Sequence, residues 1–217
     1  MLGLTPMKKD NQIIARTNSL IDREDYSGCS DNELVAIIRK ENPDQYKEII
    51  DRYQGKLFAY LYRLIGEKEE AEDLLQDVFI KAYKNLNSYD IERKFSSWIY
   101  RIAHNEAVNH IKRKSLKKFI YWDNITSTKD KMETSSAEES ADNAWIRKET
   151  NKEVGDAIKK LPLKYRQVLV LRYYSDKSYE EISEILGKPV NTVGTLIKRA
   201  KTKLSGELQD IDKDLLG

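Results

Sequence analysis

Apolar residues recur along most of the chain at spacings of three and four positions, which is the period of an amphipathic helix. The clearest stripe consists of Ile49, Tyr53, Leu57, Leu61 and Leu64. Gly66 follows it and is the expected end of that helix, because glycine readily adopts the left-handed conformation of a C-cap. An earlier helix is expected to start near Ser30 or Asp31, either of which can cap it. We find no two-residue alternation typical of strands, so the pattern predicts an all-α fold.

Two further amphipathic patterns follow before residue 118. The first contains Ala71, Leu74, Leu75, Val78, Phe79 and Ala82, and the second contains Trp98, Ile99, Ile102, Ala103, Ala107 and Ile111. The polar stretch 85–94 between them predicts a loop.

The most specific local pattern lies near the C-terminus. Ser178 followed by Glu181 predicts a capping box, and the short helix that it opens is expected to stop at Gly187. The turn 187–189 then leads into a basic helix with apolar residues at Val193, Ile197, Ala200 and Leu204. A short helix, a tight turn and a basic helix are typical of a helix-turn-helix, with a purely structural helical hairpin as the alternative.

Charge is segregated along the chain, although the net charge is only +2. Segments 107–122 and 185–206 contain no acid and five Lys or Arg each, whereas 123–142 contains six acids and two lysines. This distribution predicts two nucleic-acid contacts on either side of an acidic linker, with solvated helix ends as the alternative. We therefore divide the chain into a loosely ordered tail, a helical domain, a linker and a second helical domain, with boundaries at 1–30, 31–118, 119–144 and 145–217.

Composition excludes several kinds of chemistry. The 217 residues include 2 His and a single Cys, so an internal disulfide is impossible and a Cys/His metal site has almost no ligands. There is no phosphate-binding glycine loop and no nucleophile–base set, so we expect no enzyme, catalytic residue, metal, cofactor or small-molecule substrate. Cys29 is interpreted as incidental, with a redox-sensitive thiol as the alternative. Without a signal sequence or a long apolar span, we expect a cytoplasmic protein that is not membrane-inserted.

Three helix faces carry candidate binding chemistry. Arg101, Asn105, Asn109 and Lys112 share one face of their helix, where amide and cationic groups suit nucleic acid, and His104 and Arg113 flank that face. Taken alone, His104 is interpreted as a polar surface residue. In the basic C-terminal helix the outward residues are Thr192, Thr195, Lys198, Arg199 and Thr202. An acidic face with one apolar residue, made of Asp73, Gln76, Asp77 and Ile80, suggests a protein partner, with an ordinary solvated face as the alternative.

Four motifs in order resemble the extracytoplasmic-function (ECF) group of the bacterial sigma-70 family. They are AEDLLQDVFIKAY at 71–83, FSSWIYRIAHN at 95–105, LPLKYR at 161–166 and SYEEI at 178–182. The resemblance covers about 31–118 and 145–208 and implies a transcription initiation factor with two helical domains, sigma regions 2 and 4, on a flexible acidic linker. It implies core RNA polymerase as a partner, through its β′ coiled-coil and β flap, together with promoter DNA and an anti-sigma factor.

The resemblance also implies roles for individual residues. Polymerase binding would fall to Asp73, Gln76, Asp77 and Ile80. Contacts with the −10 element would fall to Asn87, Ser88, Tyr89, Arg101, His104, Asn105, Asn109, Lys112 and Arg113, with the 87–94 loop holding a flipped base on which an aromatic residue such as Tyr89 can stack. Contacts with the −35 element would fall to Asn191, Thr192, Thr195, Lys198, Arg199 and Thr202. Trp98 is interpreted as a core residue, with a strand-separating wedge as the alternative.

One departure from the family pattern concerns the recognition helix. Gly194 and Leu196 stand where family members usually carry basic residues, so we expect weak or altered −35 recognition. On this basis Leu196→Arg is expected to raise promoter affinity and its salt dependence. Two other classes of protein are weighed against a sigma factor. One is a helix-turn-helix regulator that binds DNA without polymerase, and the other is a helical enzyme or interaction module.

Overall fold

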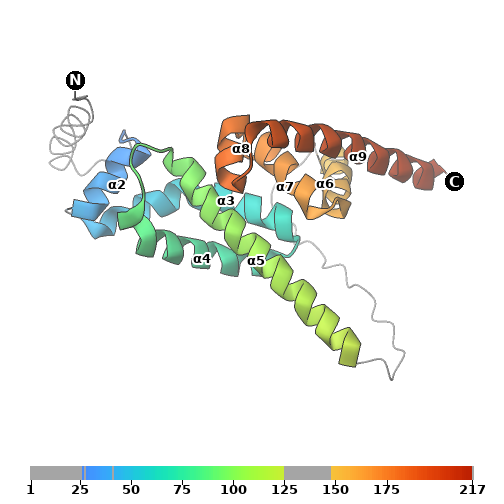
Figure 1. The fold of residues 1–217 in the computed structure, drawn as a ribbon, viewed down its shortest axis with the longest axis horizontal. Helices are drawn as coiled ribbons and strands as arrows, with labels where there is room; N and C mark the ends of the chain where they lie inside the picture. Colours follow the sequence, from blue (N-terminus) through green and yellow to red (C-terminus); the bar gives the residue numbers. More distant parts are fainter. Residues whose placement is uncertain (1–25, 27, 41, 125–147, 217) are drawn as a thin grey trace.

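The computed structural model describes residues 26, 28–40, 42–124 and 148–216, with side chains described for 26, 28–40, 42–116 and 154–208. These residues form helices and connecting turns, and no strand occurs among them, as the hydrophobic pattern predicts. Figure 1 shows an N-terminal unit formed by α2–α5 and a C-terminal unit formed by α6–α9. Within these ranges, no helix combines the length and the apolar character that crossing a bilayer requires.

The N-terminal unit is organised around its longest buried stripe. Its elements are α2 (Asp31–Lys40), η1 (Pro43–Gln45), α3 (Tyr46–Ile65), α4 (Lys68–Asn85), η2 (Leu86–Ser88) and α5 (Phe95–Asn124). All five apolar residues of the predicted stripe are buried on α3, which packs against α4 and α5. The helix ends where predicted, because Gly66 has a φ of +91° and its N–H donates to the carbonyl of Tyr62.

The C-terminal unit contains the predicted helix-turn-helix. Its elements are α6 (Lys148–Lys160), α7 (Leu163–Leu169), the π-helical turn η3 (Val170–Tyr174), α8 (Tyr179–Leu186) and α9 (Val190–Leu216). The capping box is confirmed: the Glu181 N–H donates to Ser178 Oγ at 3.1 Å, and the Ser178 N–H donates to Glu181 Oε2 at 2.9 Å. The turn is also confirmed, since Gly187 ends α8 with a φ of +61°.

The observed structure differs from the expected boundaries at two places. The end of the expected tail is anchored, because Tyr26 and Cys29 are buried and Arg52 donates to their carbonyl oxygens at 2.7 and 2.8 Å. Helix α5 continues to Asn124, so the first six residues of the expected linker, 119–124, are helical. The rest of the tail and linker, 1–25 and 125–147, lies outside the described residues.

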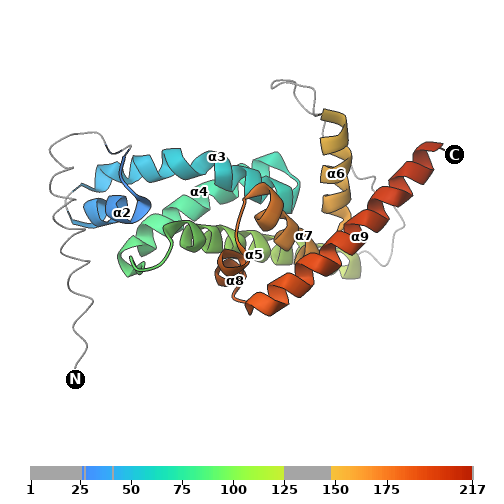
Figure 2. The same ribbon diagram turned by 90° about the horizontal axis from the view of Figure 1, so that it is seen from above.

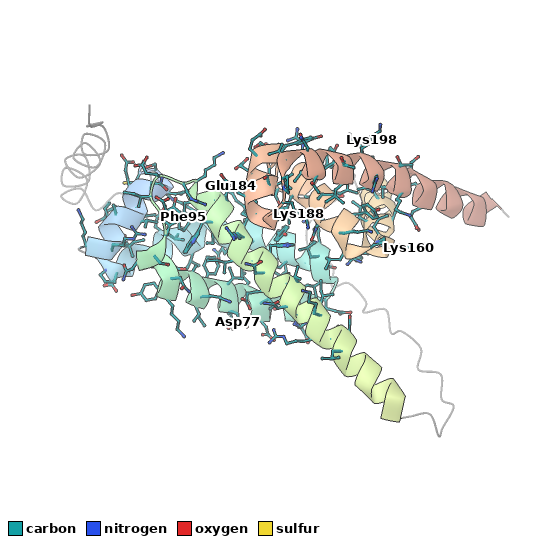
Figure 3. The ribbon with its side chains drawn as sticks, in the orientation of Figure 1. Asp77, Phe95, Lys160, Glu184, Lys188 and Lys198 are labelled. Carbon is teal, nitrogen blue, oxygen red and sulfur yellow. The ribbon has the colours of Figure 1, made fainter. Side chains whose placement is uncertain are left out.

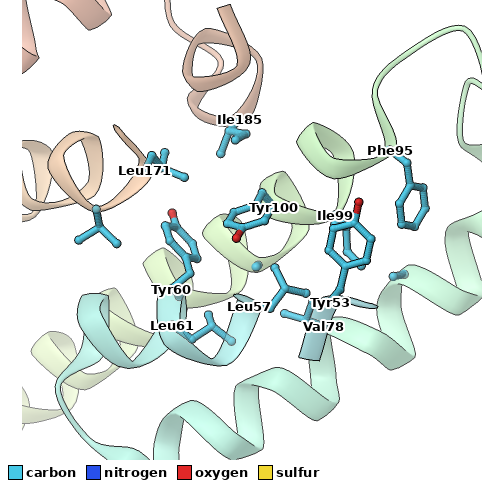
Figure 4. Packing of buried hydrophobic residues seen from close by; sticks show 14 of the residues in the cluster. Tyr53, Leu57, Tyr60, Leu61, Val78, Phe95, Ile99, Tyr100, Leu171 and Ile185 are labelled. Carbon is cyan, nitrogen blue, oxygen red and sulfur yellow. The ribbon is translucent and has the colours of Figure 1, made fainter. Parts of the chain in front are cut away.

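The two units pack against each other. Helix α8 lies against α5, while η3, α6 and α7 lie against α3, and Figures 1 and 2 show α8 beside α5 from both directions. Figure 4 shows Leu171 and Ile185 of the C-terminal unit facing Tyr60 and Tyr100 of the N-terminal unit. These four residues belong to one continuous buried cluster. The described helices of the two units therefore share one core.

Candidate functional site

The first candidate surface is the outer face of α4. Its inner face buries Ala71, Leu74, Val78, Phe79 and Ala82 against the neighbouring helices. On the opposite face, Asp73, Gln76, Asp77 and Ile80 are all exposed. The Ile80 side chain stands 53% exposed among carboxylate and amide groups, which leaves an apolar contact available to a partner.

Tyr83 extends this α4 face, and sequence reasoning did not assign it to the site. It is 47% exposed and lies seven residues after Gln76 and three after Ile80, spacings that keep it on the same side of the helix. Its ring packs edge-on against Tyr46 at a centroid distance of 4.9 Å, and the Tyr46 hydroxyl donates to the Phe79 carbonyl at 2.8 Å. Its helical spacing from Gln76 and Ile80 could have predicted from the sequence that Tyr83 belongs to this face. The α4 face is therefore acidic with an exposed Ile–Tyr pair.

The second surface begins with the loop after α4, which is braced by helix α2. Arg39 Nε donates to the Leu86 carbonyl at 3.0 Å, and the same guanidinium also donates to the Tyr89 carbonyl. Asn32 Nδ2 donates to the Ile91 carbonyl at 2.6 Å. These bonds fix the loop backbone from outside the loop. The sequence pattern did not predict a role for Asn32 or Arg39, because helical spacing indicates only which residues share a face of one helix.

The loop residues differ in accessibility. Asn87 and Ser88 are exposed, but Tyr89 is only 3% exposed. Its hydroxyl donates to Asn32 Oδ1 at 2.8 Å, and its ring contacts Phe95 and Trp98 at centroid distances of 5.3 and 5.0 Å. Burial raises the pKa of Tyr89. As placed here, Tyr89 supports the loop from inside and cannot stack on an unpaired base, so the expectation that it is available for stacking is corrected. Trp98 packs against the core and is partly buried, as interpreted from the sequence.

The exposed face of α5 carries most of the predicted polar stripe. Arg101, Asn105, Asn109, Lys112 and Arg113 are all exposed, while Ile99, Ala103 and Ala107 are buried on the other side. Amide groups can both donate and accept hydrogen bonds, and the cations can bind phosphate. The structure therefore presents these five side chains together on α5, close after the braced loop.

His104 does not belong to that exposed face. It is only 8% exposed, and its Nδ1 lies 3.1 Å from the Tyr60 hydroxyl. Burial, together with the nearby charge of Lys188, lowers the pKa of His104 to about 4, so the ring is neutral at pH 7. Its interpretation as a polar surface residue was wrong because His104 is buried against Tyr60 of α3, close to the charge of Lys188.

The basic cluster at the end of α5 is partly neutralised by α4. Glu70 accepts from Lys114 Nζ at 2.7 Å and lies 3.0 Å from His110 Nε2. Burial acts to raise the pKa of Glu70, but the contacts with Lys114 and His110 outweigh it and hold that pKa below its usual value. Among the described side chains, no carboxylate forms an ion pair with Lys112 or Arg113, so these two exposed cations are better placed to bind a nucleic-acid backbone.

The third surface is the first part of α9. Val193, Ile197 and Ala200 are buried, which turns the predicted polar residues outward. The exposed residues are Asn191, Thr192, Thr195, Lys198, Arg199 and Thr202. The structure adds Tyr165 and Lys203, which line a shallow hollow of about 780 Å³ with four of these residues. The Lys203 ammonium lies 5.9 Å from the centre of the Tyr165 ring. The hollow is therefore lined by cationic and hydroxyl side chains of α9 and by one aromatic ring of α7.

Gly194 and Leu196, which stand where basic residues are usual, each pack against neighbouring parts of the protein. A Cβ added at Gly194 would lie 3.6 Å from the Tyr179 ring, an ordinary contact distance, so the glycine faces α8 and the site has room for alanine. Leu196 is half-buried and packs against the core. The expectation that Leu196→Arg simply adds a phosphate contact is therefore corrected, because the substitution also removes apolar packing.

Among the described residues, no group of three or more His, Cys, Asp or Glu side chains is placed to hold a metal ion. Figure 3 shows Asp77 of the α4 face and Lys198 of the α9 surface at opposite edges of the molecule.

Comparison with known proteins identifies the family. Residues 49–116 match the model of sigma-70 region 2, and residues 151–204 match that of sigma-70 region 4. The chain is 38% identical over 179 residues to the ECF RNA polymerase sigma factor SigW of Bacillus subtilis, covering 80% of this chain and 94% of SigW. It is 30% identical over 188 residues to the ECF sigma-E factor of Escherichia coli K12, covering 84% and 96%. The chain belongs to the sigma-70 family. Within that family it is an RNA polymerase sigma factor of the ECF group. These similarities do not favour the alternative of a helix-turn-helix regulator that binds DNA without polymerase.

Solved structures show the same fold. CnrH, in its complex with the cytosolic domain of CnrY, aligns with a TM-score of 0.61 at 23% identity, covering 83% of this chain and 97% of CnrH. RpoE of Bartonella quintana, in its complex with the anti-sigma factor NepR, also aligns with a TM-score of 0.61, at 22% identity, covering 76% and 96%. The match to the region 2 model lies within the N-terminal unit and the match to the region 4 model within the C-terminal unit, so the two units correspond to regions 2 and 4.

Proposed function

We propose that this sigma factor divides its work among the three surfaces, beginning with the α4 face as the docking site for core RNA polymerase. Asp73, Gln76, Asp77 and Ile80 supply acceptor groups around one apolar contact, and Tyr83 enlarges that contact. Such a mixture favours a protein partner with basic and apolar side chains, as expected for the β′ coiled-coil. The β flap is proposed to bind region 4.

We further propose that the braced loop and α5 read the −10 element as an unpaired strand. Asn87 and Ser88 stand exposed on a backbone that Arg39 and Asn32 hold in place. Arg101, Asn105 and Asn109 supply hydrogen-bonding groups for bases, and Lys112 and Arg113 supply charge for the backbone. Tyr89 and His104 act from behind this surface, Tyr89 by supporting the loop and His104 by its bond with Tyr60.

Helix α9 is proposed to read the −35 element in the major groove of duplex DNA. Asn191, Thr192 and Thr195 lie in its first turns, where a recognition helix contacts base edges. The Thr195 hydroxyl donates to the Asn191 carbonyl at 2.9 Å, which leaves its oxygen free to accept from a base. Lys198, Arg199 and Thr202 follow on the same side and suit the phosphate backbone.

One observation carries the proposal. The same chain exposes two separate surfaces of cationic and amide or hydroxyl side chains, on α5 with its loop and on α9, together with the acidic α4 face and its exposed apolar residue. An anti-sigma factor is proposed as a further partner. It is supported by the likeness to RpoE, whose structure was solved with the anti-sigma factor NepR.

Run-off transcription on a genomic fragment library tests the proposal. Core polymerase with the protein should produce defined transcripts that core alone does not, and their aligned start sites should reveal both promoter elements. Asp73→Ala with Asp77→Ala should abolish both the transcripts and the capture of core in a pull-down. Asp51→Ala is the matched control, since it removes an exposed carboxylate of α3 outside the α4 face. Capture of core by the double variant at the wild-type level would refute the assignment of the α4 face.

A further inference from the structure

The α5 face that carries the proposed −10 residues also exposes one large apolar side chain. Leu116 is 59% exposed, more than any other large apolar residue among the described side chains. It lies four residues after Lys112 and seven after Asn109, spacings that place it on the same side of the helix. A single exposed leucine on an ordinary surface needs no explanation, so its surroundings decide what it can do.

The surroundings of Leu116 are polar and cationic. Since successive residues of an α-helix are turned by about 100°, Leu116 falls inside the sector of the α5 face occupied by Arg101, Asn105, Asn109 and Lys112. The sequence contains no acid from 107 to 122. This charge favours a polyanionic partner, while the leucine requires that the same partner also offer an apolar group.

Contacts on the other side of α5 hold Leu116 in this outward position. Lys114 Nζ donates to Glu70 Oε1 at 2.7 Å, and His110 Nε2 lies 3.0 Å from Glu70 Oε2. Both contacts attach α5 to α4 within the two turns before Leu116. They limit rotation of α5 about its axis, so Leu116 stays on the side that faces away from Glu70.

The position of Leu116 along α5 places it beyond the bases assigned to the polar residues. The seven residues from Asn109 to Leu116 correspond to about 10 Å, at about 1.5 Å per residue. That length spans about three base pairs at about 3.4 Å each. The 87–94 loop, which is proposed to hold a flipped base, lies at the opposite end of α5 (Figure 1). Leu116 is therefore placed to meet base pairs that are still closed, at the edge of the −10 element.

Thymine is the base that offers a leucine an apolar group in the major groove of DNA. Its 5-methyl group lies at the edge of the base, beside the hydrogen-bonding groups that all base pairs present there. The phosphates next to such a thymine would meet the exposed cations Lys112 and Arg113. Duplex DNA with a thymine in the right position therefore matches both the charge of this surface and its apolar centre.

We propose that Leu116 reads a thymine methyl group in the duplex immediately upstream of the −10 element, so that region 2 recognises a short promoter segment in addition to the −10 element itself. This inference rests on the proposed function of the α5 face. The upstream side follows from the order of the chain, because α5 leads toward region 4 and the −35 element assigned to α9 lies upstream. The contact buries about one methyl group, so it adjusts the choice among promoters.

Binding of the polymerase holoenzyme to modified promoter fragments tests this contact. In a promoter recovered by run-off transcription, each position flanking the −10 element on either side is set in turn to thymine and then to uracil, which lacks the methyl group. At one or two adjacent upstream positions, uracil should weaken binding of the wild type about fourfold, the equivalent of about 0.8 kcal/mol for one buried group. Leu116→Ala should abolish this difference. Leu116→Met keeps an apolar side chain of similar size and should retain it.

The outcomes separate this contact from the function on which it rests. The role of Leu116 would be overturned by the absence of an upstream uracil effect, or by an equal effect in Leu116→Ala. It would also be overturned if Leu116→Ala weakened binding to thymine and uracil fragments equally, because that result indicates a contact with polymerase or another protein. The proposed function has its own readout, since changing the −10 element of the unmodified fragment should abolish binding by the wild type. Binding that does not depend on the −10 element would refute the function of the α5 face, whatever the uracil comparison shows.

Discussion

The two proposed promoter-reading surfaces are held in place by different means. The 87–94 loop of region 2 depends on bonds from α2, where Arg39 and Asn32 donate to backbone carbonyls that follow them by 47 and 59 positions, respectively. In region 4, helix α9 is positioned by neighbouring segments, through the capping box of α8, the turn at Gly187 and apolar packing against α7 and α8. One surface is fixed by distant polar contacts and the other by local ones.

This difference matches the two forms of DNA that the surfaces are proposed to read. An unpaired strand has no regular geometry, so the protein must supply a rigid loop to select its conformation. Duplex DNA is already regular, and a helix that enters its groove needs only an exposed polar face. We therefore expect substitutions of distant bracing residues to impair −10 recognition and substitutions of local caps to affect region 4.

The largest effect is expected from Arg39→Ala. The substitution removes the donors to the Leu86 and Tyr89 carbonyls, and leaving such part-buried acceptors unpaired costs about 2–3 kcal/mol of unfolding free energy. It should also reduce transcription that depends on the −10 element by more than about tenfold, because the loop loses its fixed geometry. Urea unfolding and run-off transcription measure the two effects.

Two companion variants sharpen the Arg39 experiment. Arg39→Lys keeps the charge but not the forked geometry, so it should fall between wild type and Arg39→Ala. Lys40→Ala changes an exposed neighbour and should behave as wild type. Normal −10 selectivity in Arg39→Ala would show that the loop is not held by α2.

Acidification should destabilise the packed units through His104. Burial and the Lys188 charge lower the pKa of His104 to about 4, from an ordinary value near 6.5. The unfolded chain therefore binds a proton that the folded chain excludes, and the stability present above pH 6.5 is lost as the pH falls toward 4. At pH 5 the loss attributable to this residue is about 2 kcal/mol relative to pH 8.

Comparison with His104→Gln isolates that contribution. Glutamine can still bond with the Tyr60 hydroxyl but does not titrate, so its unfolding free energy should depend less on pH between 4 and 6.5. Chemical unfolding of both proteins at matched pH values gives the difference. Parallel pH profiles would mean that His104 is accessible to water in the folded protein.

Features determined by nearby residues could be predicted from the sequence. The stripe on α3, the helix end at Gly66 and the capping box at Ser178 each depend on residues within one or two turns, and all are confirmed. The α4 face was predicted for the same reason, since spacing along a single helix determines which side is exposed.

Features created by distant packing could not be predicted. Tyr89 and His104 were expected to be available to DNA, but both are buried, Tyr89 against Asn32 of α2 and His104 against Tyr60 of α3. Arg39 gave no signal as a loop brace because its partners follow it by 47 and 50 positions. The packing of α8 against α5 joins segments on either side of a long linker, and the sequence pattern within each helix contains no information about it.

A smaller effect is expected from Ser178→Ala, which removes half of the capping box. The Glu181 N–H loses its acceptor, and loss of an N-cap side chain costs about 1 kcal/mol. The change should lower the stability of region 4 and weaken the −35 contribution without altering −10 selectivity. Thermal unfolding measures the loss of stability, and transcription from two templates, one without the −10 element and one without the −35 element, separates the two contributions. Ser205→Ala, at an exposed position of α9, is the control. An equal loss on both templates would contradict the local nature of the cap.

The smallest effects are expected from removing single phosphate contacts. Measuring them on the α9 surface and on the α5 face compares the two surfaces directly. Lys198→Ala should reduce the salt dependence of holoenzyme binding to a −35 duplex, lowering the slope of log affinity against log salt by about 0.9. Lys112→Ala should lower the corresponding slope for a −10 single strand by about 0.7, since single strands release fewer counterions. Lys160→Ala removes an exposed charge from α6 and should leave both slopes unchanged. If Lys198→Ala altered the single-strand slope instead, α9 would be reading the strand assigned to α5, and the division of labour between the two units would be wrong.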